Sequence, residues 1–335
     1  MGTPSLDELR AEVDGELRRF LAARRAELPE ANDLVAEIER LLDSGGKRIR
    51  PAFCYWGYRA AGGRHGPEAV RAAASLELLH TFAIVHDDIM DSSEERRGIP
   101  TVHVRHGVDV ALLVGDLALV LADDLFLASG FPPVAAGRAF EWYSRMRQQV
   151  IAGQYLDLQL ARHPVVSEAS ARRVAVLKSG RYTIEHPLAI GASLAGAAAD
   201  LLTRVLAFGA PLGEAFQLRD DLLGIFGDRS ATGKPVDSDI REGKRNVPFA
   251  KAIELLAEPG RASLVAGWGG GAALNDADVA RLRALVEDSG ARAATEALLE
   301  ALTEESLAAL TRLPIPPEAR AALEELAHVA TARST

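Results

Sequence analysis

The chain has 335 residues, enough for one large domain or two ordinary ones, and its net charge is −9 at neutral pH. Binding to a phosphate backbone needs a basic surface, so this charge argues against a nucleic-acid partner. The single cysteine, Cys54, excludes an intramolecular disulfide and a zinc site built from cysteines. With 48% apolar and only 5% aromatic residues, the composition favours helices over strands.

From its N-terminus and its apolar runs we expect a soluble, cytoplasmic protein with no transmembrane segment. Residues 1–21 are charged and amphipathic and lack the apolar core of a signal peptide. The longest run of low charge, 186–202, contains Asp200 and falls short of the ~20 residues that a membrane span requires.

Helical periodicity dominates the rest of the chain, and period-two alternation is almost absent. Clusters of helix-breaking residues separate segments of helical length. We therefore predict a single all-α domain over residues 1–335, without internal repeats. The predicted breaks lie at 44–48, 61–67, 96–100, 129–133, 161–164, 209–213, 227–247, 267–271 and 314–317.

One predicted helix begins at Pro67, which suits a first helical turn, and runs to about Ser92. Its C-terminal end holds Asp87, Asp88 and Asp91, although the helix dipole disfavours anions there. Asp87 and Asp91 share one face, a turn apart. Clustered carboxylates suit magnesium, which bridges to substrate phosphates. The alternative is a solvated acidic helix end; as an exposed acid, Asp88 could be changed to alanine with the fold intact.

A second acidic pair strengthens the metal interpretation. Asp220 and Asp221 close another apolar helical stretch, with Gly224 at the position where a third acid would stand. Two such groups on separate helices could oppose each other and clamp metal ions against one diphosphate. By contrast, Asp123 and Asp124 lack a third acid and following basic residues, and we interpret that pair as ordinary surface.

Basic residues gather beside these acids and beside glycines. Lys47, Arg48 and Arg50 follow a glycine pair at the start of a predicted helix, where N–H groups and basic side chains favour an anion. A lone lysine or arginine is usually a solvated surface residue, so the grouping is the informative feature. The other grouped cations are Arg96, Arg97, Lys178, Lys234, Lys244 and Arg245.

In this order the motifs resemble those of the trans-isoprenyl diphosphate synthases, or polyprenyl synthetases. The resemblance spans about residues 40–250 and implies an all-α bundle around a deep central cavity, the isoprenoid synthase fold, usually as a homodimer. It implies condensation of isopentenyl diphosphate with an allylic diphosphate (dimethylallyl, geranyl or farnesyl), with two or three magnesium ions. The matching stretches are GGKRIRP (45–51), LLHTFAIVHDDIMDSSEERRGIPTVH (78–103), GQYLDL (153–158), LKSGRYT (177–183), FQLRDDLLGIFGD (216–228) and TGKP (232–235).

Carried over by position, the resemblance assigns roles to individual residues. The magnesium ligands would be Asp87, Asp88, Asp91 and Asp220, with Asp221 and Asp228 as weaker candidates. The allylic diphosphate would contact Arg96, Lys178, Lys234 and Lys244, and isopentenyl diphosphate would contact Lys47, Arg50, His80 and Arg97. The reaction centre would be lined by Gln154, Asp157, Ser179, Phe216 and Gln217.

The same resemblance bears on product length and on one departure. Ala83 lies one turn before Asp87 and leaves the start of the cavity open, while Phe82 lies to the flank of that face. This pair resembles the pattern of enzymes that make geranylgeranyl diphosphate, with farnesyl or longer products as alternatives. Many members have aspartate where this chain has Gly224, so we expect fewer carboxylates on that wall; Asn246, where threonine is common, is a smaller departure.

Two other functions are compatible with parts of the pattern. A class I terpene cyclase shares the helical bundle and one aspartate-rich motif, but it binds a single diphosphate and has no need of GGKRIRP. A catalytically silent subunit of a heteromeric synthase tends to lose acids or substrate lysines, whereas this chain keeps its first motif whole.

Overall fold

The secondary structure is almost entirely helical, as the composition predicts. The computed structural model describes residues 4–227 and 237–332. Within these ranges the one sheet is an antiparallel hairpin of two-residue strands, β1 (Glu95–Arg96) and β2 (Ile99–Pro100), at a predicted helix break.

The chain divides into two compact units. The first comprises Met1–Ser144, His186–Leu206 and Leu310–Leu326, and the second Arg145–Glu185, Ala207–Ala309 and Ala327–Thr335. A single domain over residues 1–335 stays a prediction. The helices with residues in both units are α7 (Pro133–Ala161), α10 (Ala199–Phe226), α16 (Ala291–Thr311) and α17 (Pro317–Thr331).

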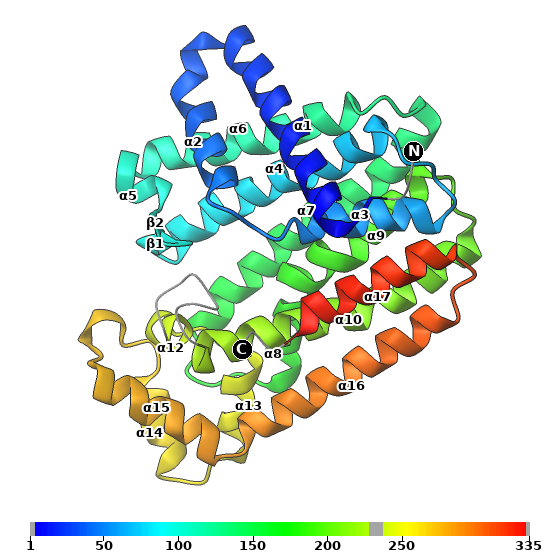
Figure 1. The fold of residues 1–335 in the computed structure, drawn as a ribbon. Helices are drawn as coiled ribbons and strands as arrows, with labels where there is room; N and C mark the ends of the chain where they lie inside the picture. The colour runs from blue at the N-terminus through cyan, green and yellow to red at the C-terminus, as the bar shows by residue number, and fades with distance from the viewer. Residues whose placement is uncertain (1–3, 228–236, 333–335) are drawn as a thin grey trace. The chain divides into compact units, whose positions relative to one another are not determined.

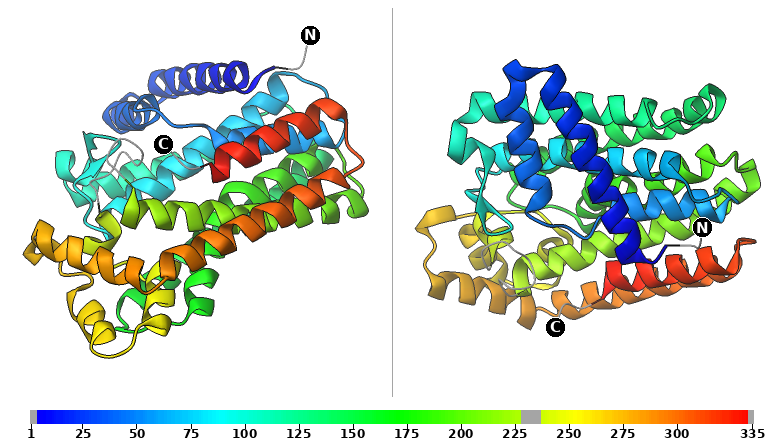
Figure 2. Two further views of the ribbon diagram at one scale, coloured as in Figure 1. Left: turned by 60° about the horizontal axis from the view of Figure 1, so that its bottom comes forward. Right: turned by 45° about the horizontal axis from the view of Figure 1, so that its top comes forward.

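In the first unit, α4 is the helix around which the others gather. It packs against both α3 and α6 (Figure 1). The antiparallel pair α1 and α2, dark blue in Figure 2, lies over α4 and α6. Fully buried side chains such as Trp56, Leu76 and Phe126 fill the space between these helices. The elements are α1 (Leu6–Glu27), η1 (Pro29–Ala31), α2 (Asn32–Asp43), α3 (Ile49–Ala60), α4 (Pro67–Met90), α5 (Val102–His106), α6 (Val108–Leu127) and α9 (His186–Leu194).

The second unit has its own core, in which Leu218, Phe249 and Trp268 are buried together. One of its segments is a π-helix, η2, a rare form that is frequent at functional sites. The elements that lie wholly in this unit are α8 (Glu168–Val174), η2 (Ala175–Glu185), α12 (Ser238–Glu242), α13 (Val247–Leu255), α14 (Gly260–Gly267), η3 (Gly271–Ala273) and α15 (Asp276–Asp288).

Most predicted breaks fall between helices, but the break at 209–213 is wrong. Helix α10 runs through this stretch with Pro211 inside it. A proline in a helix interior costs about 3 kcal/mol, which the burial of neighbours such as Phe208 and Leu212 offsets. Among the residues that the structure describes, no helix has both the length and the apolar composition needed to span a membrane.

Candidate active site

Helix α4 carries the first aspartate-rich group at its C-terminal end, as predicted. Asp87 and Asp88 lie in its last turn, and Asp91 caps it by donating its backbone N–H to the Asp87 carbonyl at 2.8 Å. Asp87 and Asp91 are half-buried, whereas Asp88 is only 2% exposed. The view of Asp88 as an exposed acid is therefore wrong, because its side chain turns inward.

The hairpin that follows α4 brings Arg96 back to these aspartates. Arg96 Nε donates to both oxygens of Asp88, at 2.9 and 3.0 Å, and Nη2 lies 2.7 Å from Asp88 Oδ1. Asp87 Oδ2 is 3.5 Å from the same Nη2. Burial alone would lower the pKa of Arg96, but the carboxylates of Asp88 and Asp87 outweigh it and raise that pKa. The predicted contact of Arg96 with a diphosphate stays a prediction; here the guanidinium binds the protein's own acids.

The structure brings three of the predicted isopentenyl diphosphate contacts together. Arg50 lies in the first turn of α3 and His80 on α4. Loss of hydration and the nearby guanidinium groups of Arg50 and Arg97 hold the pKa of His80 well below its usual value. His80 is therefore a neutral hydrogen-bonding group beside two cations at neutral pH. The fourth predicted contact, Lys47, is exposed in the loop before α3.

In the second unit, the motifs GQYLDL and LKSGRYT contact each other, while the roles of their residues at a reaction centre stay predictions. Lys178 Nζ donates to Asp157 Oδ2 at 2.6 Å, which joins the π-helix η2 to α7, the helix that also carries Gln154. The next residue, Ser179, is buried. A Cβ on Gly180 would lie 2.8 Å from the backbone carbonyl carbon of Gly213, so η2 and α10 touch backbone to backbone. The sequence gives no signal for the π-helix itself.

The two acids of the second motif have different environments on α10. The Asp220 side chain is 43% exposed, with Arg219 Nη1 at 3.5 Å. Asp221 is buried and accepts from Gln217 Nε2 at 2.7 Å and from the Val247 backbone N–H at 3.3 Å. Burial, with a smaller contribution from a neighbouring aspartate, raises the pKa of Asp221 to about 7. The metal roles of Asp220 and Asp221 stay predictions.

Another carboxylate takes the space beside Gly224, where an aspartate is common in the family. A Cβ at this position would collide with the carboxylate of Asp239, whose Oδ1 would be 2.7 Å away. Asn246 Nδ2 donates to Asp239 Oδ2 at 3.0 Å. Asp239 therefore places a carboxylate of α12 beside Gly224, and the effect of Gly224 on metal binding stays a prediction. Asp239 is not predictable from the sequence as a neighbour of Gly224, because no helical spacing relates the two positions.

The structure describes only some of the other predicted site residues in and after the second motif. Lys244 Nζ lies 3.2 Å from Glu242 Oε2. Lys234 and Asp228 lie outside the described residues. Phe216 is half-buried on α10, one residue before Gln217.

Phe82 and Ala83, the predicted determinants of product length, are both half-buried on α4. The Phe82 ring packs edge-on against His86, with ring centroids 4.9 Å apart. His86 Nε2 in turn lies 3.2 Å from the Leu112 carbonyl of α6, and a Cβ on Gly115 would collide with its imidazole. Phe82 therefore packs with the residue that faces α6, and its control of product length stays a prediction.

The donor set on α4 fits magnesium chemically. Within residues 4–227 and 237–332, no three His, Cys, Asp or Glu side chains come close enough to hold a metal ion by themselves. Magnesium needs fewer, because it is usually held by one or two carboxylates together with waters and substrate phosphates. The half-buried carboxylates of Asp87 and Asp91, one turn apart, meet that requirement.

Comparison with known proteins agrees with this geometry. The family model described as polyprenyl synthetase matches residues 32–286. The chain belongs to the polyprenyl synthetase family. A geranylfarnesyl diphosphate synthase of Aeropyrum pernix is 36% identical over 82% of this chain and 86% of its own length. A (2E,6E)-farnesyl diphosphate synthase of Mycobacterium bovis is 35% identical over 84% and 78%.

The similarity extends to the whole fold. A crystal structure of geranylgeranyl pyrophosphate synthase from Corynebacterium glutamicum, complexed with isoprenyl diphosphate and magnesium, matches with a TM-score of 0.94 and 38% identity. The match covers 99% of this chain and 100% of that one. This polyprenyl synthetase is therefore a prenyltransferase with the all-α isoprenoid synthase fold, as the resemblance implied. The three relatives described here by name are a geranylfarnesyl, a farnesyl and a geranylgeranyl diphosphate synthase, so product length varies among them.

Proposed function

We propose that this prenyltransferase joins isopentenyl diphosphate head to tail to an allylic diphosphate, releases pyrophosphate and depends on magnesium. The observation that supports this most directly is that a basic group, Arg50 and Arg97 beside His80, and the acidic group of Asp87 lie two turns apart along α4. His80, with Arg50 and Arg97 close by, precedes Asp87 by seven residues, roughly 10.5 Å along the helix axis. The basic group suits one diphosphate directly, and the acids suit a second one through metal ions.

Breaking the allylic C–O bond requires a stabilised leaving group. Two or three magnesium ions, when bound, would neutralise the diphosphate and so supply that stabilisation. The carboxylates of Asp87, Asp91 and Asp220 would hold them, assisted by Asp88 and Asp221. Lys178, Lys234 and Lys244 would donate hydrogen bonds to the same diphosphate, as would Arg96.

The remaining residues would hold the second substrate and shield the cation. Lys47, Arg50, His80 and Arg97 would bind isopentenyl diphosphate, whose double bond attacks the allylic carbon as a new C–C bond forms. The proton lost in restoring a double bond would leave with the departing pyrophosphate. Water must be excluded meanwhile. The residues proposed to line this centre are Gln154, Asp157, Ser179, Phe216 and Gln217.

For the product we propose geranylgeranyl diphosphate. The small, half-buried Ala83, one turn before Asp87, supports a tail that extends past this position. The bulky Phe82 beside it supports a limit on further growth. Farnesyl diphosphate and longer products are the alternatives, and the relatives' names span that range.

We also propose that the enzyme works as a homodimer. A mainly apolar exposed stripe on α6, interrupted by Asp116, supports this proposal, since Val108, Leu112, Val120 and Leu127 recur at helical spacing on its surface. A second copy of the chain, which offers the same stripe, is the occupant that fits it. Sedimentation of the purified protein would measure the assembly state, and a monomer at micromolar concentration would contradict the proposal.

The decisive experiment incubates the purified chain with dimethylallyl, geranyl or farnesyl diphosphate, with and without isopentenyl diphosphate. We expect a longer prenyl diphosphate only when isopentenyl diphosphate is present, no reaction in excess EDTA, and recovery when magnesium is restored. A cyclic hydrocarbon formed from the allylic substrate alone would support a terpene cyclase. A correctly folded chain without activity would support a silent subunit.

A further inference from the structure

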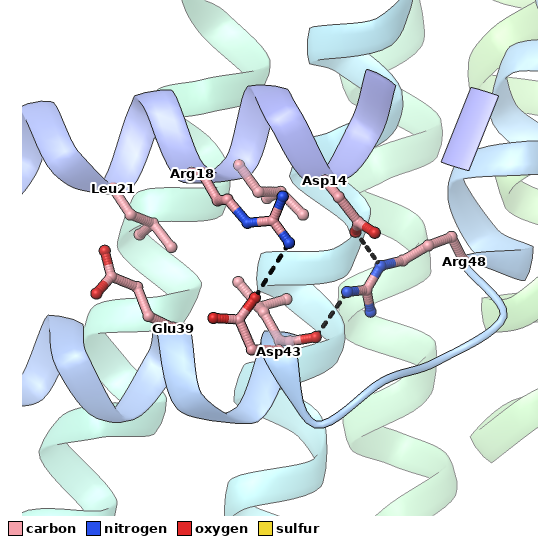
Figure 3. A pocket seen from close by; sticks show the side chains of 8 residues that line it. Asp14, Arg18, Leu21, Glu39, Asp43 and Arg48 are labelled. Carbon is pink, nitrogen blue, oxygen red and sulfur yellow. Dashed lines mark hydrogen bonds and ion pairs between the residues drawn. The ribbon is translucent and has the colours of Figure 1, made fainter. Parts of the chain in front are cut away.

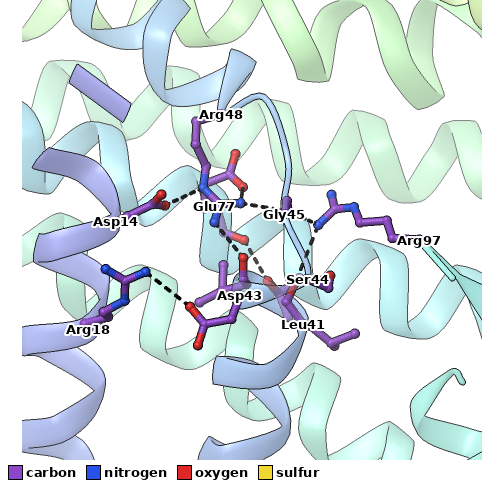
Figure 4. Close-up of polar contacts among 11 residues, drawn as sticks. Asp14, Arg18, Leu41, Asp43, Ser44, Gly45, Arg48, Glu77 and Arg97 are labelled. Atoms are coloured by element: carbon purple, nitrogen blue, oxygen red, sulfur yellow. Dashed lines mark hydrogen bonds and ion pairs between the residues drawn. The ribbon is translucent and has the colours of Figure 1, made fainter. Parts of the chain in front are cut away.

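Arg48 is used differently from the two basic residues that flank it. Its side chain is buried just before α3, and four contacts hold its guanidinium inside the protein (Figure 4). Nε donates to Asp14 Oδ1 of α1 at 2.7 Å, and Nη1 to Glu77 Oε2 of α4 at 3.1 Å. Nη2 donates to the Leu42 carbonyl at 2.7 Å, and Nη1 also reaches the Gly45 carbonyl at 3.3 Å. The expectation that Arg48 contributes to the anion site is therefore corrected.

The fourth contact links Arg48 to the basic group beside His80. The Gly45 carbonyl also accepts a hydrogen bond from Arg97 Nη1, so the guanidinium groups of Arg48 and Arg97 both donate to the same peptide oxygen. A Cβ on Gly46 would lie 2.9 Å from Arg48 Nη1 and 3.3 Å from Arg97 Nη2. Gly46 also has φ +139°, a conformation that favours glycine. The glycine pair thus allows both arginines to close on the loop that carries Lys47.

Two like charges this close need a counter-charge. The Glu77 side chain is 4% exposed; it pairs directly with Arg48 and also attracts Arg97, but only in part offsets the charge of Arg97. Burial alone would lower the pKa of Arg48, but Glu77 and then Asp14 raise it. Burial and the other arginines lower the pKa of Arg97 despite Glu77. Arg48 is thus fully compensated by acids, whereas Arg97 remains the cation with the greater need of an anion.

We propose that Arg48 is a positioning residue for the isopentenyl diphosphate site, held by Asp14 and Glu77 and acting through the Gly45 carbonyl on Arg97 and on the loop of Lys47. The inference rests on the proposed function, because that function makes Arg97 and Lys47 ligands. It adds α1, which carries none of the recognised motifs, to the elements that shape the site. Asp14 is the α1 residue through which this acts.

A neighbouring ion pair provides a matched control. Arg18 lies one turn after Asp14 on α1, and its Nη2 is 3.4 Å from Asp43 Oδ1 of α2 (Figure 3). Both residues line the same small pocket as Arg48. Their side chains are 68% and 62% exposed, and the ion pair between them does not involve the glycine loop. Breaking this pair disturbs α1 and α2 without touching the loop.

The test compares Asp14→Asn and Arg48→Lys with Arg18→Ala. Asp14→Asn keeps the side-chain shape, and Arg48→Lys keeps the charge but loses the fork that reaches four partners at once. Calorimetric titration with isopentenyl diphosphate gives Kd without turnover. Steady-state kinetics give KM for each substrate and kcat, and thermal melts report the stability of each variant.

We expect Asp14→Asn and Arg48→Lys to raise Kd and KM for isopentenyl diphosphate about tenfold, as for one misplaced charged hydrogen bond. The allylic KM and kcat should stay within about twofold of wild type. Arg18→Ala should behave as wild type. The inference is overturned if both variants bind isopentenyl diphosphate like wild type, or if they weaken both substrates alike.

The proposed function and the role of Arg48 can be refuted separately. A wild-type chain that binds isopentenyl diphosphate but condenses nothing would overturn the proposed function, while the titrations would still decide the role of Arg48. A wild-type chain that condenses its substrates, with variants indistinguishable from Arg18→Ala, would overturn only the role of Arg48. Failure of the wild type to bind isopentenyl diphosphate would overturn both.

Discussion

Replacing Asp88 with alanine removes one partner of a buried ion pair, so we expect a loss of stability as well as of activity. Arg96 contacts both oxygens of Asp88 at 2.7 to 3.0 Å, and the side chains of Arg96 and Asp88 are 15% and 3% exposed. In the variant, the guanidinium would keep Asp87 as its nearest acid, at 3.5 Å. Removing one partner of such a pair costs about 3–5 kcal/mol.

Two smaller effects act in the opposite direction. Alanine is a better helix former than aspartate by roughly 0.5 kcal/mol. Removing an anion from the C-terminal end of α4 relieves an unfavourable dipole interaction of up to about 1 kcal/mol. The net loss is then about 3 kcal/mol. At an unfolding entropy of about 2.1 cal/mol/K per residue over 335 residues, Tm should fall by about 4 °C.

Circular dichroism melts in EDTA measure this loss without interference from metal binding. The double variant Asp88→Ala/Arg96→Met removes both charges, so it should recover most of the stability while remaining inactive. Asp124→Ala, an exposed acid of the comparable pair on α6, should change neither property. The reasoning is refuted if Asp88→Ala melts at the wild-type temperature, or if the double variant melts below Asp88→Ala.

Five further variants test other parts of the site. Lys47→Ala should raise KM for isopentenyl diphosphate about tenfold, whereas Lys234→Ala should chiefly affect the allylic substrate; identical kinetic effects would contradict the two-site assignment. Ala83→Phe should shorten the product toward farnesyl diphosphate and Phe82→Ala should lengthen it, as chromatography would show; unchanged products would remove α4 from length control. Because the folded pKa of Asp221, about 7, exceeds its unfolded value, stability should fall as pH rises from about 4 to 7. In EDTA melts, Asp221→Asn should remove this pH-dependent loss, which totals up to about 4 kcal/mol between pH 4 and 7; an unchanged pH dependence would contradict the raised pKa.

The parts of the fold that depend on local chemistry follow from the sequence. Pro67 marks the start of α4 because a residue without an N–H suits the first helical turn, and the helix ends at Met90, two residues before the predicted end. The aspartates fall at that end as predicted. Most breaker clusters separate helices because glycine and proline act on the backbone where they stand.

The parts that depend on tertiary contacts do not follow from it. Pro211 predicts the end of a helix, but packing of the surrounding apolar residues keeps α10 continuous through it. From the sequence, Gly224 only marks the absence of an aspartate. In the structure, the carboxylate of Asp239, fifteen residues further along the chain, lies beside it. The sequence predicts an exposed Asp88 because it does not reveal the hairpin that brings Arg96 next to it. The strands of this hairpin have two residues each, too few to show a period-two pattern.

The arginines of the first unit show why a cluster of cations cannot be divided into roles by sequence alone. Arg48 and Arg96 each have a buried acid as a direct partner, Glu77 and Asp88, so the protein neutralises them itself. The principal contacts of Arg97 are instead with carbonyl oxygens, at Gly45 and Leu41. Carbonyls satisfy its hydrogen bonds but leave its charge in place. On the proposed function, an incoming diphosphate would complete the neutralisation at Arg97, so a binding site for an anion is defined as much by where the buried acids are placed as by where the arginines are.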